Sequence, residues 1–202
     1  MFTGIIEKIA KVVDIQANQS NLTFTLDCAL ANELKVDQSI AHNGVCLTVT
    51  SINELQNSYQ VTAIQETLTR TNLGHLKIND LVNMERCLKL ESLLDGHLVQ
   101  GHVDTTAICT KVEEIGGSWK YYFDYALNNK QGYITVEKGS VTVNGVSLTV
   151  VDSGLNTFSV AIIPYTYEHT NFKSLHVGNE VNIEFDIVGK YIAKLLANTK
   201  SL

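Results

Sequence analysis

The sequence predicts an all-β protein in which two copies of one domain are followed by a single α-helix. Three observations lead to this prediction. Blocks of sequence recur in the same order about half a chain apart, both halves contain short β-forming segments between turn signals, and the last residues carry an apolar stripe with helical spacing. The chain has 202 residues, which is enough for one or two domains of ordinary size.

The internal repeat decides the expected domain organisation. Four blocks recur at offsets between 97 (101 − 4) and 101 (144 − 43) residues, and one block keeps six of its seven residues. This period is far longer than the roughly 20–50 residues of a solenoid repeat. We therefore expect two domains, at 1–97 and 98–195. The repeated blocks are 4–6 with 101–103, 43–49 (NGVCLTV) with 144–150 (NGVSLTV), 67–72 with 166–171, and 76–85 with 175–184.

Each copy is expected to be built from strands. Several segments are rich in Thr, Tyr, Phe and β-branched residues, and pairs such as Asn43-Gly44, Asn144-Gly145, Asn79-Asp80 and Gly116-Gly117 mark turns between them. Segment 28–34 is expected to form one or two helical turns. This pattern favours a small barrel or a sandwich. The expected strand segments are 20–26, 45–50, 58–64, 141–151 and 159–163.

The last element is predicted to be an amphipathic helix at about 187–202. Its apolar residues fall at positions i, i+3, i+4, i+7 and i+8, and lysines lie off this stripe. A helix of three to four turns is marginal alone, so the stripe must pack either on a barrel or on copies of itself in an oligomer. The stripe consists of Val188, Tyr191, Ile192, Leu195 and Leu196.

Composition excludes several classes of protein. Hydrophobic residues make up 45% and charged residues 18% of the chain, as in ordinary globular proteins and unlike disordered ones. A net charge of −6 without any basic run argues against nucleic-acid binding. No apolar run reaches the ~18–20 residues that span a bilayer, and the first residues do not resemble a signal peptide. We therefore expect a cytoplasmic protein without membrane contact.

No pattern in the sequence indicates a metal or a nucleotide cofactor. The four cysteines, Cys28, Cys46, Cys87 and Cys109, form no CxxC pair, and His97 and His102 lie five residues apart, which matches no metal-binding pattern. A disulfide framework is not expected in a protein that is not secreted. A glycine-rich phosphate loop is also missing from the sequence.

The repeated NG-x-[CS]-LTV segments suggest a duplicated surface site. Side chains alternate between the two faces of a strand, so the three apolar residues of each segment should fill the interior, while Cys46 with Thr48, and Ser147 with Thr149, should point outward. Such a pair can equally be an ordinary solvated strand face. Gly4 and Gly101 occupy matching places and could let a flat ring lie against the backbone. The copies differ in chemistry, with Cys46 against Ser147 and Ile5 against His102, which suits a reaction between two identical molecules in different roles.

Several segments in correct order resemble the riboflavin synthase family of the α-chain type. They are 1–6 (MFTGII), 42–50 (HNGVCLTVT), 66–68, 71–74, 96–103 (GHLVQGHV) and 144–150, and the resemblance covers nearly the whole chain. It implies two tandem homologous six-stranded antiparallel Greek-key barrels plus a C-terminal helix, and a homotrimer held by those helices. It also implies a transferase that dismutates two molecules of 6,7-dimethyl-8-ribityllumazine, one donating a four-carbon unit to the other, with no metal or added cofactor.

The resemblance also implies the site residues. The expected catalytic residues are Cys46, His102, Ser147 and Thr149. The first barrel is expected to bind lumazine through Gly4, Ile5, Ile6, Cys46, Leu47, Thr48, Thr62, Ala63, Ile64, Gln65, Glu66 and Thr67. The second is expected to use His102, Val103, Asp104, Lys138, Ser147, Leu148, Thr149, Ile163, Pro164, Tyr165, Thr166, Tyr167 and Glu168, although Tyr165, Tyr167, Glu168 and His169 depart from the family pattern. The first barrel of one subunit is expected to face the second barrel of its neighbour.

Chemical differences between the copies lead to one mechanistic hypothesis. We expect His102 to act with Ser147 and Thr149 in the second barrel and remove a proton from a lumazine methyl group, while Cys46 and Thr48 orient the other molecule. Two alternatives remain at this point. One is a non-catalytic antenna protein of the same fold that binds one lumazine or flavin. The other is the flavin-binding barrel of a reductase, which this chain would have without the nucleotide-binding partner domain.

Overall fold

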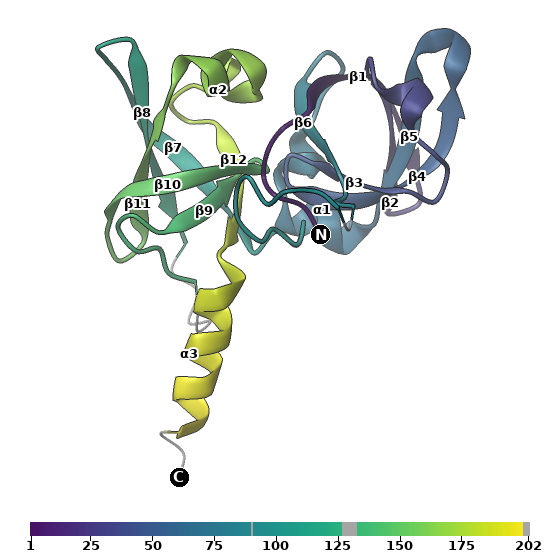
Figure 1. The fold of residues 1–202 in the computed structure, drawn as a ribbon. Coiled ribbons are helices and arrows are strands. Elements are labelled where there is room, and N and C mark those ends of the chain that lie inside the picture. The colour runs from purple at the N-terminus through teal and green to yellow at the C-terminus, as the bar shows by residue number, and fades with distance from the viewer. Residues whose placement is uncertain (90, 127–132, 200–202) are drawn as a thin grey trace.

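The computed structural model describes residues 1–89, 91–126 and 133–199 and consists of two closed β-barrels beside each other, with one helix that projects away from them (Figure 1). Each barrel has six antiparallel strands. The predicted all-β architecture of two tandem barrels and a C-terminal helix is therefore confirmed. The boundaries expected for the two domains remain a proposal.

In the first barrel the strand order is β1-β2-β5-β4-β3-β6. Strands β3, β4 and β5 follow one another around the wall, and β6 returns to lie beside β3, which is the Greek-key arrangement. The strands are β1 (Lys8–Asn18), β2 (Asn21–Asp27), β3 (Ser39–His42), β4 (Val45–Asn53), β5 (Ser58–Ala63) and β6 (Leu81–Arg86), with short helices η1 (Ala31–Glu33), η2 (Glu54–Gln56), α1 (Gln65–Arg70) and η3 (Asn72–His75).

The second barrel repeats this order as β7-β8-β11-β10-β9-β12. Its predicted segment 141–151 is in fact two strands joined by the Asn144-Gly145 turn, because both turn residues have positive φ angles of 46° and 79° and so form a tight hairpin. Its strands and helices are β7 (Thr105–Ile115), β8 (Ser118–Tyr125), β9 (Ser140–Val143), β10 (Val146–Ser153), β11 (Thr157–Ile162), β12 (Glu180–Phe185), α2 (Pro164–His169) and η4 (Asn171–Ser174).

Each barrel encloses its own apolar core. In β4, Val45, Leu47 and Val49 are buried, and the matching residues of β10 are buried in the same alternation. The first core is completed by residues such as Phe24 and Tyr59. The second core is richer in rings and contains Tyr121, Phe123, Tyr125, Phe158, Phe172 and Phe185.

Six asparagines, five of them buried and Asn171 half-buried, connect the barrels. The backbone N–H of Asn72 donates to Asn182 Oδ1 at 2.7 Å, and the backbone N–H of Asn171 donates to Asn83 Oδ1 at 2.7 Å. The side-chain amides of Asn83 and Asn182 each donate at 2.9 Å to the carbonyl of a turn asparagine in the opposite barrel, Asn144 and Asn43 respectively. These bonds occur in pairs related by the repeat. The two barrels are therefore related by an approximate two-fold axis that passes between the Asn-Gly turns.

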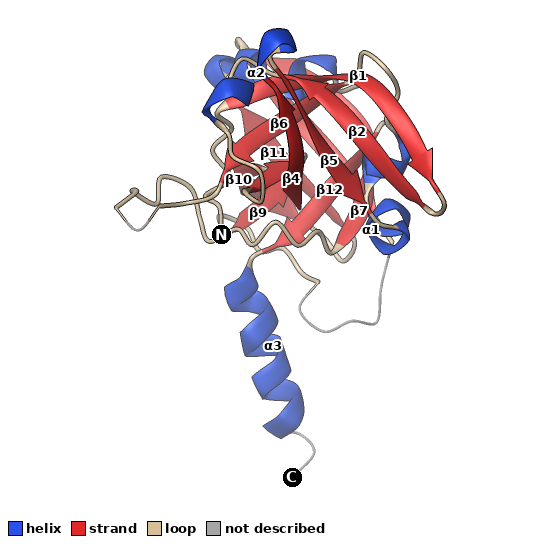
Figure 2. Ribbon diagram, turned by 90° about the vertical axis from the view of Figure 1, so that its right-hand side faces the viewer, coloured by secondary structure: helices blue, strands red, loops and turns tan. Residues whose placement is uncertain are grey.

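The C-terminal helix α3 (Ile187–Thr199) starts at the second barrel and extends away from both (Figures 1 and 2). Lys190 in its first turn forms an ion pair with Asp104, and both side chains are largely shielded from solvent. Tyr191 and Leu195 on the apolar stripe are 67% and 65% exposed. The alternative in which the stripe packs on its own barrel is therefore wrong, since the helix touches the barrel only at its start.

The asparagine network predicts that Asn83→Ala is strongly destabilising. The substitution leaves the part-buried N–H of Asn171 and the buried carbonyl of Asn144 without these partners, and each unsatisfied buried group costs about 1–3 kcal/mol. We expect the free energy of unfolding measured in urea to fall by about 3 kcal/mol. Asn18→Ala, at an exposed position at the end of β1, is the matched control. A loss below about 1 kcal/mol for Asn83→Ala would show that the network does not hold the barrels together.

Candidate active site

Two chain segments cross between the barrels. Phe2 and Val99 form an antiparallel bridge, so the N-terminal segment and the segment that leads into the second barrel run past each other (Figure 1). As a result the backbone N–H of Ser147 donates to the carbonyl of Gly4 at 2.8 Å, and that of Cys46 donates to the carbonyl of Gly101 at 2.9 Å. Each segment therefore lies between the barrels and reaches the wall of the other barrel.

This crossing corrects the grouping of residues expected from the sequence. Gly4, Ile5 and Ile6 were expected beside Cys46, but Gly4 contacts β10 and Ile6 packs on the second core. His102 and Val103 were expected in the second barrel, but Gly101 contacts Cys46 and Val103 packs on the first core. The backbone N–H of His102 is bound to Glu184 on the second barrel. Joint action of His102 with Ser147 remains a prediction.

Both glycines are points of close approach, but their partner in the structure is the chain itself and not a flat ring. Both glycines have positive φ angles, +79° for Gly4 and +76° for Gly101. A Cβ atom on Gly4 would lie 2.6 Å from Ser147 Cβ, and one on Gly101 would lie 2.7 Å from Cys46 Cβ. Both positions therefore require glycine.

Two buried carboxylates hold these segments in place. Glu85 accepts hydrogen bonds from the backbone N–H groups of Thr3 at 2.6 Å and Gly4 at 2.9 Å. Glu184, at the matching position of the second barrel, accepts from those of Gln100 at 2.7 Å and His102 at 2.9 Å. Burial raises the pKa of both carboxyl groups, and the backbone donors oppose that rise. Each carboxylate thus holds the backbone of one crossing segment in position.

The outer walls of β4 and β10 carry the predicted polar pairs. Cys46 and Ser147 are half-buried, and Thr48 and Thr149 are exposed. Val49 is opposite Val61 and Val150 is opposite Val160. The polar pairs therefore lie beside the segments that leave β5 and β11, which contain the expected binding residues of α1 and α2.

Ser147 has a histidine partner that sequence reasoning missed. His97 Nδ1 lies 2.7 Å from Ser147 Oγ, and its Nε2 lies 3.2 Å from Thr142 Oγ1. Burial lowers the pKa of His97, so the imidazole is neutral at pH 7 and can accept a proton from the serine hydroxyl. On sequence grounds His97 was rejected as a metal ligand and was given no other role, because its distance of 50 residues from Ser147 gives no local signal.

Cys46 has a different environment. Burial is the largest effect on its thiol and raises the pKa of Cys46. The thiol therefore remains protonated at neutral pH and acts as a soft neutral group rather than a thiolate nucleophile. His102 lies next to Gly101 on this side of the molecule and is exposed.

Of the other expected residues, Lys138 and Thr62 lie at or near the barrel surface, whereas Asp104 has a structural role. Lys138 is exposed in the loop before β9 with φ of 62°, and Thr62 Oγ1 lies 2.9 Å from Thr23 Oγ1 on the wall of the first barrel. Asp104, in contrast, accepts a hydrogen bond from the backbone N–H of Phe185 and pairs with Lys190. Its carboxylate is therefore engaged in anchoring α3.

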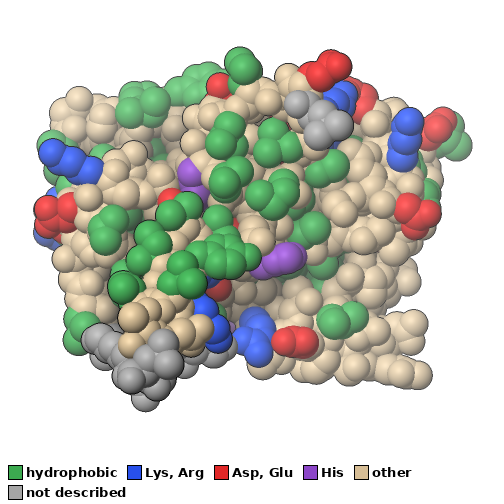
Figure 3. Space-filling model, turned by 60° about the horizontal axis from the view of Figure 1, so that its bottom comes forward, with side chains coloured by type: hydrophobic (Ala, Val, Ile, Leu, Met, Phe, Trp, Pro, Cys, Tyr) green, Lys and Arg blue, Asp and Glu red, His purple; other side chains and the backbone are tan. Residues whose placement is uncertain are grey.

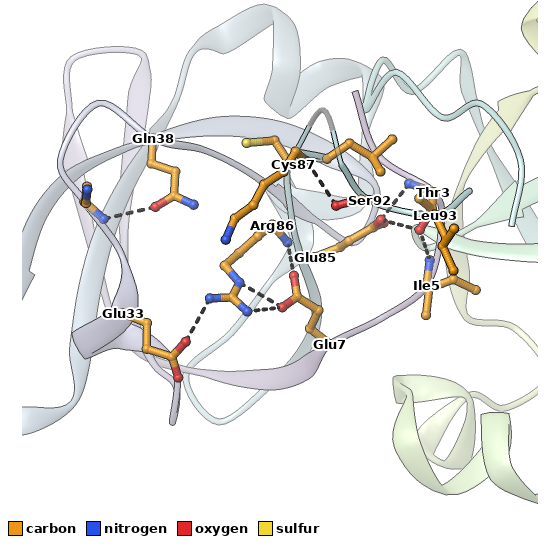
Figure 4. A pocket seen from close by; sticks show the side chains of 13 residues that line it. Thr3, Ile5, Glu7, Glu33, Gln38, Glu85, Arg86, Cys87, Ser92 and Leu93 are labelled. Carbon is orange, nitrogen blue, oxygen red and sulfur yellow. Dashed lines mark hydrogen bonds and ion pairs between the residues drawn. The ribbon is translucent and has the colours of Figure 1, made fainter. Parts of the chain in front are cut away.

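An open cavity of about 610 Å³ lies beside the end of β6 and is lined in part by Thr3 and Ile5. Figure 4 shows Arg86 within it, held between Glu7 and Glu33 at 2.5 and 2.9 Å. Its cationic group is already neutralised by two carboxylates, so the cavity offers no free Arg86 charge to a ligand. Among the described residues no cluster of His, Cys, Asp and Glu could hold a metal ion, and no helix is long and apolar enough to cross a membrane.

Comparison with known proteins identifies the family. The model of the Lumazine binding domain family matches the chain twice, at residues 3–87 and 100–186. Riboflavin synthase of Actinobacillus pleuropneumoniae is 40% identical over 197 residues, which cover 97% of this chain and 90% of that protein. This chain belongs to the riboflavin synthase family. The enzyme of Bacillus subtilis (strain 168) is 36% identical with the same coverage, 97% and 90%.

Solved structures support the fold of the family. The crystal structure of LumP complexed with riboflavin superposes with a TM-score of 0.83 and covers 92% of this chain and 99% of that chain. LumP complexed with 6,7-dimethyl-8-(1'-D-ribityl) lumazine gives a TM-score of 0.80 over 91% and 98%. Both are 20% identical, so the likeness concerns the fold.

The contact between Gly101 and Cys46 predicts unequal effects of two glycine substitutions. Both Gly101 and Gly116 have positive φ, so alanine costs about 1–2 kcal/mol at either position. A Cβ at Gly116 meets nothing within 4 Å, whereas one at Gly101 collides with Cys46, which adds about 1–3 kcal/mol of overpacking. We expect Gly101→Ala to lower the free energy of unfolding in urea by clearly more than Gly116→Ala. Equal losses would contradict the close contact.

Proposed function

We propose that this protein is a riboflavin synthase that converts two molecules of 6,7-dimethyl-8-ribityllumazine into riboflavin and 5-amino-6-ribitylamino-2,4-pyrimidinedione. The observation that carries the proposal is the pair of lumazine-binding barrels whose equivalent outer walls bear unlike groups, Cys46 in one and Ser147 with His97 in the other. Two copies of one site accommodate two copies of one substrate. Their different chemistry suits a donor and an acceptor of the four-carbon unit.

The reaction places modest demands on the protein. The lumazine ring activates the protons of its own 7-methyl group, so no added cofactor is required. Holding two rings in register can lower a barrier by roughly 7–11 kcal/mol. The neutral His97 can take a proton through Ser147, since it is already hydrogen-bonded to the hydroxyl group at 2.7 Å. Cys46 and Thr48 then orient the second molecule.

The complete site is proposed to form between subunits of a homotrimer. Cys46 on β4 and Ser147 on β10 belong to separate barrels of one chain. In the proposed trimer the two substrates meet where the first barrel of one subunit faces the second barrel of its neighbour. Apolar side chains gather on the face from which α3 projects (Figure 3), and the apolar stripe of α3 is exposed. Such a large exposed apolar surface is typical of an oligomer interface.

An antenna protein that binds one lumazine or flavin is the second candidate. The fold alone cannot distinguish it, because LumP complexed with flavin mononucleotide also superposes, with a TM-score of 0.79. The polar pairs on both walls and the His97–Ser147 bond support the enzyme. A protein that binds a single ligand would need a polar pair on the outer wall of only one barrel.

The proposed activity predicts a defined product ratio. The purified protein, incubated with 6,7-dimethyl-8-ribityllumazine alone, should form one riboflavin and one pyrimidinedione for every two lumazines consumed. Riboflavin is followed by its fluorescence and the pyrimidine by chromatography. Tight lumazine binding without turnover would identify the antenna alternative.

The same assay tests the histidine that the structure adds to the site. His97→Gln removes the proton acceptor but keeps a hydrogen-bonding side chain, and general acid–base groups contribute roughly 10²–10⁴-fold. We expect kcat to fall within this range while riboflavin binding is retained. Leu155→Ala, at an exposed hairpin tip, is the matched control and should keep the kcat of the parent protein. An unchanged kcat would leave ring alignment as the source of the rate.

The exposed stripe predicts that the oligomer depends on α3. Ile192→Asp combined with Leu195→Asp places two charges in an apolar seam, where each uncompensated charge costs several kcal/mol. We expect light scattering to show monomers that lack turnover, because the shared site cannot form, and that still bind riboflavin. Lys194→Asp, which lies off the stripe, should leave the trimer intact. A double variant that remains trimeric would mean that other surfaces hold the subunits.

A further inference from the structure

The segments that follow β5 and β11, which contain the expected ligand residues 62–67 and 163–168, are attached to their barrels in different ways. Each follows a strand and forms a helix of six residues, α1 or α2. A helix this short is not stable by itself. Its position therefore depends on the side chains that connect it to the barrel.

In the second barrel this connection is a pair of stacked rings. Trp119 on β8 and Tyr167 on α2 have ring centroids 3.8 Å apart and planes inclined by 8°. Trp119 is opposite Ile162, the residue just before the segment Ile163–Glu168, so the stack joins β8 to the helix across the end of β11. At the equivalent positions of the first barrel (119 − 97 and 167 − 99) stand Leu22 and Leu68, which pack on the first core without any ring.

A second difference lies on the outer face of the helices. In α1, Glu66 and Arg70 form an ion pair at 3.1 Å with side chains 69% and 50% exposed. In α2 the equivalent residues (66 + 99 and 70 + 99) are Tyr165 and His169, whose rings stack at 4.1 Å, and His169 Nδ1 lies 2.8 Å from the carbonyl oxygen of Tyr165. Both ring pairs are confined to the second barrel.

We propose that the Trp119–Tyr167 stack is the positioning element of the second ligand site. It holds the segment Ile163–Glu168 in its bound arrangement before the ligand arrives, whereas the first site lacks this support. Ordering a loop on binding weakens affinity, and a preformed loop avoids that loss. Trp119 and Tyr167 act through the segment and are positioning residues. The inference rests on the proposed function, because it concerns the site where one of the two lumazines binds.

The test compares Tyr167→Leu, which gives α2 the residue of α1, with Tyr167→Phe, which keeps the ring. For Tyr167→Leu we expect KM for 6,7-dimethyl-8-ribityllumazine to rise about 10-fold, with kcat within about 3-fold of the parent, as when binding rather than chemistry is weakened. Tyr167→Phe should keep both constants within about 2-fold, since the stack needs the ring and not the hydroxyl. Trp119→Leu should reproduce the Tyr167→Leu result, and the double variant should be no worse than either single variant.

Trp119 also supplies a structural readout, because it is the single tryptophan of the chain. Its emission should shift to longer wavelength in Tyr167→Leu, where the indole gains solvent, and should not shift in Tyr167→Phe. Leu155→Ala, at the exposed tip of the same barrel, should change neither kinetics nor emission. The urea midpoint of each variant verifies that the protein is folded.

Two results would overturn the inference. One is an unchanged KM in Tyr167→Leu and Trp119→Leu. The other is a Tyr167→Phe variant as impaired as Tyr167→Leu, which would assign the effect to the hydroxyl group and its 3.5 Å bond to the carbonyl of Lys173. A parent protein without turnover would instead refute the proposed function. In that case riboflavin titrations of the same variants test the stack. A higher dissociation constant at one class of site would support it, and an unchanged dissociation constant would reject it.

Discussion

The paired hydrogen bonds between asparagines of opposite barrels determine the geometry on which the rest of the structure depends. They satisfy buried backbone groups of each barrel with side chains of the other, so neither barrel can rotate or slide without leaving polar groups unpaired. Burial of apolar surface has no such directionality. Carboxamides carry both donors and acceptors, which allows the same residue type to serve both sides of a two-fold arrangement.

That fixed geometry brings the two crossing segments onto the walls that carry the proposed site. Because Phe2 pairs with Val99, each barrel wall receives backbone from the other half of the chain. Ser147 thereby lies beside Gly4 and His97, and Cys46 lies beside Gly101. The buried carboxylates of Glu85 and Glu184 then lock the crossing segments against the barrels. The walls differ in chemistry for two reasons. One carries Ser147 where the other carries Cys46, and a crossing segment places His97 beside Ser147.

Much of this arrangement could be predicted from local pattern. The repeat predicted two like domains, alternation in NG-x-[CS]-LTV predicted which side chains face outward, and the stripe 188–196 predicted the terminal helix. The expected strand segments did not include β1, β3, β6, β7, β8 and β12. In β1 and β7, charged residues such as Lys11 and Asp14, or Lys111 and Glu113, break the apolar alternation. The crossing was not predictable because contacts such as His97 to Ser147 join residues far apart in sequence. Local spacing carries no information on which of two equivalent walls a segment reaches.

The approximate two-fold axis between the Asn-Gly turns has a consequence for the origin of the chain. An interface whose bonds occur in equivalent pairs is self-complementary, as in isologous dimers. A single barrel with such a face would pair with an identical copy, and both ligand walls would then be the same. Fusion of the two copies into one polypeptide removes that identity. Once both barrels are encoded separately, one wall can exchange a thiol for a hydroxyl, and one helix can acquire rings, while the shared interface stays unchanged.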